Sequence, residues 1–200
     1  MPKTKLIIAT NNRDKLAEIK DILSDTDIEV LSAADYDDFP DVEETGQTLM
    51  ENALLKARAV WDKYHLTCVA DDTGLEVDCL GGAPGVYSSR YAGENATYDD
   101  NCRKLISEVK KTTDARTARF RTVMVFIDKQ RNAHTADGVI EGEIIETKRG
   151  QNGFGYDPVF LVPSLGKTLA ELKPSEKNKI SHRHNALINI LPVIKEKLIG

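Results

Sequence analysis

The sequence contains no long run of hydrophobic residues. In this chain of 200 residues the longest such runs are Val123–Ile127 and Val159–Val162, whereas a membrane-spanning helix needs about 20 consecutive apolar residues. The first segment, MPKTKLIIATNNRDK, has an apolar stretch too short for the core of a signal peptide. We therefore expect a cytoplasmic protein that makes no contact with a membrane.

Cysteine is scarce, and several motifs of other enzyme classes are missing. Cys68, Cys79 and Cys102 are odd in number, lie far apart and form no Cys-x-x-Cys pair, which is typical of reduced thiols. The sequence has no Cys/His grouping of the kind that holds zinc and no Gly-x-Ser-x-Gly. It also lacks Gly-x-x-x-x-Gly-Lys-Ser/Thr. Zinc proteins, serine hydrolases of that type and P-loop NTPases are thereby excluded.

Positive charge is not concentrated anywhere in the chain. The net charge is −5 and there is no long run of Lys and Arg, whereas nucleic-acid binders usually carry a basic patch or stripe. We expect no nucleic-acid partner, although a small anionic ligand fits wherever a few basic side chains converge. With 40% hydrophobic and 30% charged residues, the composition is that of a globular protein. The length predicts a single domain over 1–200, or two lobes that share a core.

The hydrophobic periodicity predicts an α/β fold with a mixed central sheet flanked by helices. A buried strand over 5–9 is followed by a short polar turn and a helix over 14–24, which is the opening of an α/β unit. Other segments show helical spacing or apolar and alternating runs. We expect helices over 48–64, 98–109 and from 181 onwards, and strands over 28–31, 67–70, 117–128, 139–145 and 157–162.

Residues 10–15 form the turn between the first predicted strand and helix, and they are candidates for binding phosphate. A helix N-terminus offers free N–H groups and a partial positive charge, and the side chains here would add further donors. An ordinary capped helix start explains the same residues, because Asn and Asp are common caps. The candidates are Thr10, Asn11, Asn12, Arg13, Asp14 and Lys15.

Two pairs of carboxylates are candidates for metal binding and for activating water. Glu43-Glu44 precedes a turn, and Asp71-Asp72 follows directly after the predicted strand 67–70. Mg²⁺ typically uses one or two carboxylates together with substrate phosphates, and a carboxylate can also deprotonate water. A solvated acidic loop is the alternative, and we prefer it for residues 35–41. It is weaker for Asp71-Asp72, because adjacent carboxylates repel each other unless a cation or donor lies beside them.

Two later segments are candidates for binding the rest of a ligand. Gly150–Asp157 has three glycines that let the backbone approach a ligand closely, and Phe154 would stack on a planar base. A hairpin loop with core aromatics is the alternative. Lys177 and residues 181–183 place positive charge at the start of a helix, where the macrodipole disfavours it. Either an anionic or polar ligand lies near, or the segment is solvated.

Six motifs occur in a fixed order along the chain. They read Thr-x-Asn-x-x-Lys, Glu-Thr-Gly-x-Thr-x-x-Glu-Asn-Ala-x-x-Lys-Ala, Asp-Asp-x-Gly-Leu-x-Val-Asp, Gly-Gly-x-Pro-Gly-Val-Tyr-Ser-x-Arg-Tyr, Gly-Phe-Gly-Tyr-Asp-Pro and Ser-His-Arg. In this order they resemble the non-canonical purine nucleoside triphosphate pyrophosphatase family, also called inosine triphosphate pyrophosphatase or HAM1-like. The resemblance runs from Leu6 to about Leu191. Asn11 stands where the family commonly has Gly, and Thr73 where it commonly has Ser.

The resemblance implies a homodimer whose subunits have two lobes, with an active-site cleft between them. It also implies Mg²⁺-dependent hydrolysis of ITP, dITP and XTP to the monophosphate and pyrophosphate, which removes deaminated purines from the nucleotide pool. Two alternatives remain. The chain could be a related pool-cleaning pyrophosphatase with a different base preference, or a nucleotide-binding module without catalysis.

The resemblance also assigns roles to residues. It implies that segment 10–15, chiefly Thr10, Asn12 and Lys15, binds the triphosphate together with Lys56. Asp72 would be a metal ligand and the base that activates water, with Glu43 or Glu44 as the second ligand. The remaining substrate contacts would come from Thr73, Phe154, Gly155, Tyr156, Asp157, Lys177, His182 and Arg183, of which Lys177, His182 and Arg183 would contact the base.

Overall fold

The computed structural model describes residues 4–199, which form two compact units. Unit 1 runs up to Asp72 and adds Thr122–Gly138 and the chain from His182 onwards. Unit 2 consists of Thr73–Arg121 and Val139–Ser181. Three strands cross the boundaries between the units, so each unit contains part of β3, β5 and β6.

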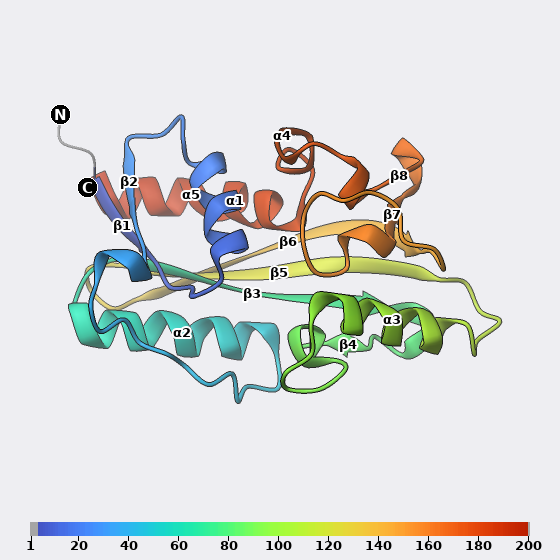
Figure 1. The fold of residues 1–200 in the computed structure, drawn as a ribbon. Helices are drawn as coiled ribbons and strands as arrows, with labels where there is room; N and C mark the ends of the chain where they lie inside the picture. Colours follow the sequence, from blue (N-terminus) through green and yellow to red (C-terminus); the bar gives the residue numbers. More distant parts are fainter. Residues whose placement is uncertain (1–3, 200) are drawn as a thin grey trace. The chain divides into compact units, whose positions relative to one another are not determined.

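The strands form one mixed sheet with the order β2-β1-β3-β5-β6-β7-β8, and β4 pairs with β3. β1 is parallel to both β2 and β3, whereas the β3–β4, β6–β7 and β7–β8 pairs are antiparallel. The predicted α/β fold with a mixed central sheet flanked by helices is therefore confirmed (Figure 1). The strands are β1 (Thr4–Ile8), β2 (Ile28–Leu31), β3 (Cys68–Val77), β4 (Pro84–Gly85), β5 (Thr117–Ile127), β6 (Ala133–Ile144), β7 (Phe160–Val162) and β8 (Lys167–Thr168).

The helices are α1 (Arg13–Ile22), α2 (Leu49–Tyr64), α3 (Tyr98–Val109), α4 (Pro174–Lys177) and α5 (His182–Ile199). Two of them, α2 and α3, begin with a capping box. Thr48 caps α2 and Thr97 caps α3, and in each helix an acidic residue three positions later bonds back to the capping residue. These reciprocal bonds satisfy N–H groups that have no partner within the helix. No helix among residues 4–199 is long and apolar enough to cross a membrane.

In unit 1 the strands β1 and β3 are covered on both faces. Leu6 and Ile8 of β1 pack with α1 and α5, whereas Ile7 packs with α2 on the opposite face. β3 divides in the same way, because Val69 joins the first cluster, and Cys68 and Ala70 join the second. Successive side chains of a strand point to opposite faces, so a strand covered by helices on both sides needs a continuous apolar run.

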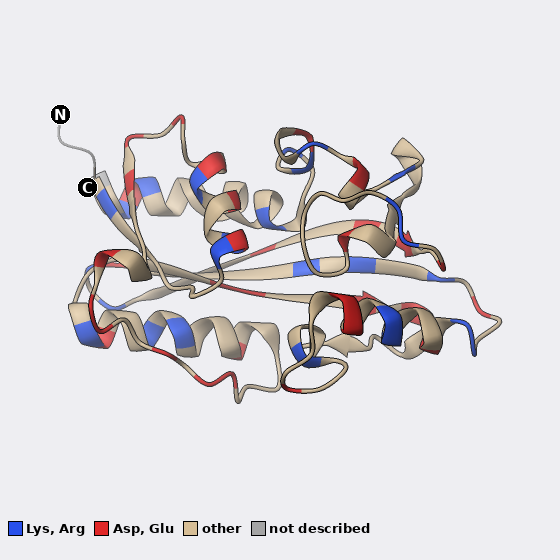
Figure 2. Ribbon diagram, in the orientation of Figure 1, with Lys and Arg blue, Asp and Glu red and all other residues tan. Residues whose placement is uncertain are grey.

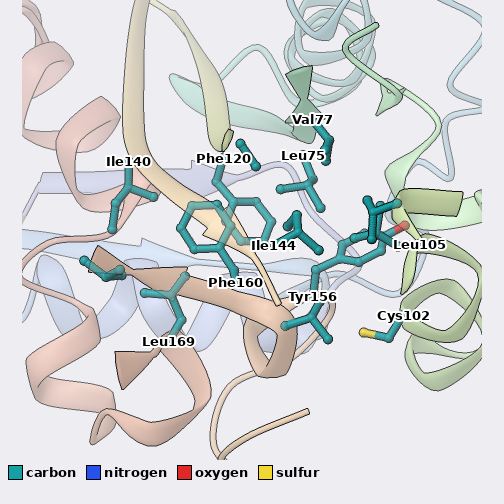
Figure 3. Close-up of a cluster of buried hydrophobic side chains, with 14 of the residues drawn as sticks. Leu75, Val77, Cys102, Leu105, Phe120, Ile140, Ile144, Tyr156, Phe160 and Leu169 are labelled. Carbon is teal, nitrogen blue, oxygen red and sulfur yellow. The ribbon is translucent and has the colours of Figure 1, made fainter. Parts of the chain in front are cut away.

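Unit 2 has its own apolar core, drawn in Figure 3. It joins the inner side of α3 to the later halves of β3 and β6, to the first part of β5 and to the segment around β7. Phe120 and Phe160 lie at its centre with ring centroids 4.7 Å apart. The predicted strand over 157–162 is shorter than expected, because Asp157–Val159 forms a 3-10 turn and only Phe160–Val162 is extended. Pro158 at the start of that turn cannot donate to a sheet ladder.

Candidate functional site

β3 is longer than its sequence predicts, and this changes the place of its two aspartates. The expectation that the strand ends at residue 70 is wrong, because it continues to Val77 and pairs with β4. It is β1 that ends here, since Ile8 is paired with Val69. Asp71 and Asp72 therefore lie just beyond the carboxyl end of β1, at the edge where ligands commonly bind in α/β sheets.

The two aspartates do not act as one pair, because they point to opposite faces of the strand. Asp71 contacts residues of α1 and α5, whereas Asp72 contacts residues of α2. Both carboxylates are buried. Each makes its direct contacts with a separate set of cations and donors, and Figure 2 marks this acidic segment of β3 in red.

Asp71 is held by two cations. Its Oδ2 lies 3.1 Å from Nζ of Lys15 and accepts from Nε and Nη2 of Arg183, each at 3.3 Å. Arg183 is fully buried and also donates to Glu18 of α1. Burial favours the neutral acid, yet Lys15 and Arg183 outweigh it and hold the pKa of Asp71 well below its usual range. Asp71 is therefore a permanent anion at neutral pH.

Asp72 is part of a second cluster, on the α2 face. Nζ of Lys56 lies 3.2 Å from Oδ1 of Asp72 and 2.6 Å from Oε1 of Glu44. The other oxygen of Asp72, Oδ2, accepts from Nδ2 of Asn52 at 3.3 Å. Burial raises the pKa of Asp72 above its usual value despite the nearby Lys56. Two neighbouring aspartates thus have pKa values shifted in opposite directions.

The start of α1 is a capped helix start, which is one of the two interpretations that its sequence allows. Asn12 is the N-cap, because its side chain accepts from the backbone N–H groups of Asp14 and Lys15. Asn11 is exposed and donates to Asp41, and Arg13 and Asp14 are also exposed. Thr10 Oγ1 accepts from the N–H of Asn12. Of the six predicted phosphate-binding residues, Lys15 is the one brought to Asp71.

The loop before α2 separates the two adjacent glutamates. Glu43 is exposed, whereas Glu44 reaches Lys56. Glu51 is used by the capping box, where it accepts from the N–H groups of Gln47 and Thr48. Glu44 is therefore the glutamate that the structure brings to Asp72, through their shared contact with Lys56.

Unit 2 contains one buried ion pair beside an aromatic ring. Nζ of Lys177 lies 2.5 Å from Oδ2 of Asp157 and 4.8 Å from the ring centroid of Phe154. Asp157 Oδ2 also accepts from the N–H of Phe154 at 2.9 Å. Gly153, with φ of 73°, has no room for a Cβ, which would lie 2.0 Å from Asp157 Oδ2. The Asp157 carboxylate thus organises the loop that carries Phe154.

The other predicted residues of this loop are core or backbone positions. Tyr156 is buried, and its hydroxyl donates to the carbonyl oxygen of Ser88, which fits the alternative of a core aromatic for its side chain. The carbonyl oxygen of Gly155 accepts from Sγ of Cys102. The structure divides the predicted basic group, because Lys177 belongs to unit 2 and His182 and Arg183 belong to unit 1.

Sequence reasoning overlooked two residues of unit 1 that contact the aspartate clusters. Glu18 lies three residues after Lys15, on the same side of α1, and binds Arg183. Asn52 is a buried polar residue within the apolar stripe that begins at Leu49. The sequence did indicate a role for Asn52, because a polar residue on the buried side of a helix needs a specific partner.

Among residues 4–199 no group of three or more His, Cys, Asp or Glu side chains is arranged to hold a metal ion. The two carboxylates that share Lys56, Glu44 and Asp72, form the candidate metal centre. Mg²⁺ is commonly bound by one or two carboxylates, with water and substrate phosphates completing its shell, so this donor set fits such an ion.

Comparisons with known proteins agree with this architecture. The model of the Ham1 family matches residues 6–193. A dITP/XTP pyrophosphatase of Thermoanaerobacter sp. (strain X514) is 48% identical over 195 residues, covering 97% of this chain and 98% of that protein. A dITP/XTP pyrophosphatase of Coxiella burnetii is 42% identical over 198 residues, covering 98% of each chain.

Solved structures extend the similarity to the fold. A HAM1 protein from Coxiella burnetii has a TM-score of 0.88 and 42% identity, covering 96% of this chain and 99% of that one. The Ham1 protein of Staphylococcus aureus has a TM-score of 0.84 and 44% identity, covering 96% and 98%. With a family match over nearly its whole length, the chain belongs to the Ham1 family.

Proposed function

We propose that this protein hydrolyses the non-canonical purine nucleotides ITP, dITP and XTP to the monophosphate and pyrophosphate. The observation that carries the proposal is the buried Asp72, which shares the Lys56 ammonium with Glu44. Relatives at 42–48% identity are named dITP/XTP pyrophosphatases, and the motifs of that family are present in this chain. Removal of such nucleotides from the pool would take place in the cytoplasm.

Glu44 and Asp72 would hold Mg²⁺, with Glu43 as an exposed neighbour that contributes charge. When bound, Mg²⁺ neutralises phosphate charge and supports the departure of pyrophosphate. The protein's own cations serve the same end. Lys15 and Lys56 would bind triphosphate oxygens, and the N-terminus of α1 would add backbone donors there.

Asp72 is the residue that we propose as the base. Burial raises the pKa of Asp72 above its usual value, and a carboxylate positioned beside a water molecule can accept its proton. Lys56 and Asn52 hold its two oxygens, so the carboxylate is oriented before substrate arrives. No covalent intermediate is needed, because phosphoryl transfer depends chiefly on positioning and charge stabilisation.

The nucleoside would be bound by the loop from Phe154 to Asp157, with Lys177, Thr73, His182 and Arg183 as further contacts. Phe154 would stack on the base. Arg183 has donors only, so it would favour a base with a carbonyl at position 6. Because its guanidinium is engaged with Asp71 and Glu18, contact with the base requires an additional or exchanged partner.

A pyrophosphate-release assay over ITP, XTP, dITP, ATP, GTP and UTP, with and without Mg²⁺, tests the proposal. We expect Mg²⁺-dependent release from ITP, XTP and dITP, and at least about tenfold lower kcat/KM for ATP. Preferred turnover of UTP would instead identify a related enzyme with another base preference. Binding of nucleotides without any release would identify a non-catalytic module. A homodimer, which we also propose, would have twice the 22.2 kDa mass of the chain by light scattering.

A further inference from the structure

Asn52 is fully buried at the start of α2, four residues after the capping Thr48. Both ends of its side-chain amide are bonded. Oδ1 accepts from the N–H of Gly46 at 2.7 Å, and Nδ2 donates to Oδ2 of Asp72 at 3.3 Å. A single side chain thus connects the loop that carries Glu44 to the carboxylate of Asp72.

The orientation of this amide is determined by its partners. A backbone N–H can only donate, so the atom that faces Gly46 must be the amide oxygen. The amide nitrogen is then directed at Asp72, where it finds an acceptor. Aspartate at position 52 would keep the bond to Gly46 but present a second acceptor to Asp72, so asparagine is the residue that satisfies both sides.

Gly46 shows how closely the loop is held. A Cβ at this position would lie 2.6 Å from Oδ1 of Asn52 and 2.7 Å from Cβ of Glu51. Those distances are below normal contact, so only glycine lets the loop approach the helix this far. Glu51 holds the following two N–H groups, so the loop is fixed immediately after Glu44.

We propose that Asn52 is a positioning residue for the metal centre. This inference rests on the proposed function, in which Glu44 and Asp72 hold Mg²⁺. By donating to Oδ2 of Asp72, Asn52 leaves Oδ1 on the side of Lys56 and Glu44. By accepting from Gly46, it sets how far the Glu44 loop stands from that oxygen. Residues that orient metal ligands commonly affect metal affinity or activity by about 10–100-fold.

The second Thr-capped helix provides a matched control. Asn101 occupies the same position in α3, four residues after Thr97, and is also buried. Its Oδ1 accepts from the N–H of Ala92 at 2.8 Å and its Nδ2 donates to the carbonyl oxygen of Ser89 at 3.0 Å. Asn101 therefore fastens a loop to a helix in the same way, but its donor partner is a backbone carbonyl rather than a carboxylate.

The experiment compares Asn52→Ala with Asn101→Ala in the full-length protein. Mn²⁺ binding without nucleotide is measured by electron paramagnetic resonance, and the Mg²⁺ dependence of kcat and KM for ITP is measured in parallel. We expect Asn52→Ala to weaken Mn²⁺ binding and to raise the half-saturating Mg²⁺ concentration by about 10–100-fold. KM for ITP at saturating Mg²⁺ should change by less than about threefold, because the triphosphate and base contacts remain. Asn101→Ala should lower the thermal midpoint but leave Mn²⁺ affinity within about twofold.

Equal Mn²⁺ affinity in Asn52→Ala and the wild type would overturn the inference, as would equal weakening by Asn101→Ala. If Asn52→Ala does not fold, Gly46→Ala tests the same contact from the loop side, and unchanged Mn²⁺ affinity there overturns it. A wild type that binds no Mn²⁺, with or without inorganic tripolyphosphate, also overturns it. A wild type that binds Mn²⁺ but releases no pyrophosphate overturns the proposed function and leaves this inference standing.

Discussion

The two units differ in how they use buried charge. Unit 1 surrounds the aspartates of β3 with Lys15, Lys56 and Arg183, which come from three different helices. In unit 2 Lys177 and Asp157 form a buried pair, and the ammonium lies over the ring of Phe154. The first arrangement concentrates exchangeable cations, whereas the second uses one ion pair to hold an aromatic loop.

The proposed function gives these two arrangements different uses. A triphosphate carries three or four negative charges, and an enzyme that cleaves it must supply several cations that can leave their resting partners. A base is flat and nearly neutral, so shape and a few donors suffice for it. We therefore expect changes at Lys15, Lys56 and Asp72 of unit 1 to affect turnover and phosphate affinity, and changes in unit 2 to affect nucleoside affinity and stability.

The largest expected difference is between asparagine substitutions at two buried aspartates that contact a lysine, Asp72 in unit 1 and Asp157 in unit 2. Asp72→Asn should lower kcat by about 10²–10⁴-fold, because it removes the proposed base and a metal ligand. Asp157→Asn should mainly lower the thermal midpoint, because it leaves the Lys177 ammonium buried without its partner. Steady-state kinetics and thermal unfolding of both variants check this. Near-normal kcat and unchanged Mg²⁺ dependence in Asp72→Asn would contradict the assignment.

Substitutions of the buried lysines in the two units should have effects of intermediate size. Lys15→Ala and Lys56→Ala each remove a cation proposed to contact phosphate, and a hydrogen bond to a charged group contributes about 1.5–3 kcal/mol. That corresponds to roughly 10–150-fold in affinity. The measurement is inhibition by inorganic tripolyphosphate, which reports on the phosphate end alone. Lys177→Ala is the control and should leave the inhibition constant unchanged; equal weakening in all three variants would argue against the division.

A smaller effect is expected on the choice of base. Arg183→Ala should lower the ratio of kcat/KM for ITP to that for ATP by at least about tenfold, because the donor-only guanidinium would otherwise face the amino group of adenine. Phe154→Ala should lower both values together, since stacking does not distinguish purines. If Arg183→Ala reduces ITP and ATP turnover by the same factor, Arg183 acts only as the partner of Asp71 and Glu18.

Most of the fold could be predicted because local pattern and tertiary packing agree. The bounds expected for the strand 28–31 and the helix 98–109 are those observed for β2 and α3. The predicted end of β3 was wrong because Asp71-Asp72-Thr73-Gly74 has the composition of a turn. The burial of Leu75 and Val77 in unit 2 and the pairing with β4 keep the strand extended, and neither can be read from the polar segment itself.

The candidate site was predictable as a set of residues but not as a set of contacts. The motifs identified Lys15, Lys56 and Asp72, which the structure indeed places among partners of opposite charge. The interpretation of the two aspartates as one pair overlooked the alternation of a strand, which sends Asp71 to α1 and α5 and Asp72 to α2. The contacts of Asn52 depend on which loop and strand pack against α2, so spacing along the helix cannot supply them.

The smallest expected difference concerns the apolar cores. The buried cysteine thiols of both units should be alkylated slowly. Burial raises the pKa of the Cys68 thiol in unit 1 to about 12 and that of Cys102 in unit 2 to about 11. A raised pKa means that less thiolate is present at a given pH, and at pH 8 the fractions are on the order of 10⁻⁴ and 10⁻³. Cys79 is only partly buried, so iodoacetamide at pH 8 should label it first in the native protein, while denaturant exposes all three. Cys79→Ser should then give almost no native labelling, as read by mass spectrometry. Fast alkylation of Cys102 but not of Cys68 would show that the core of unit 2 opens more readily, and the contrast between the units would then extend from their charges to their packing.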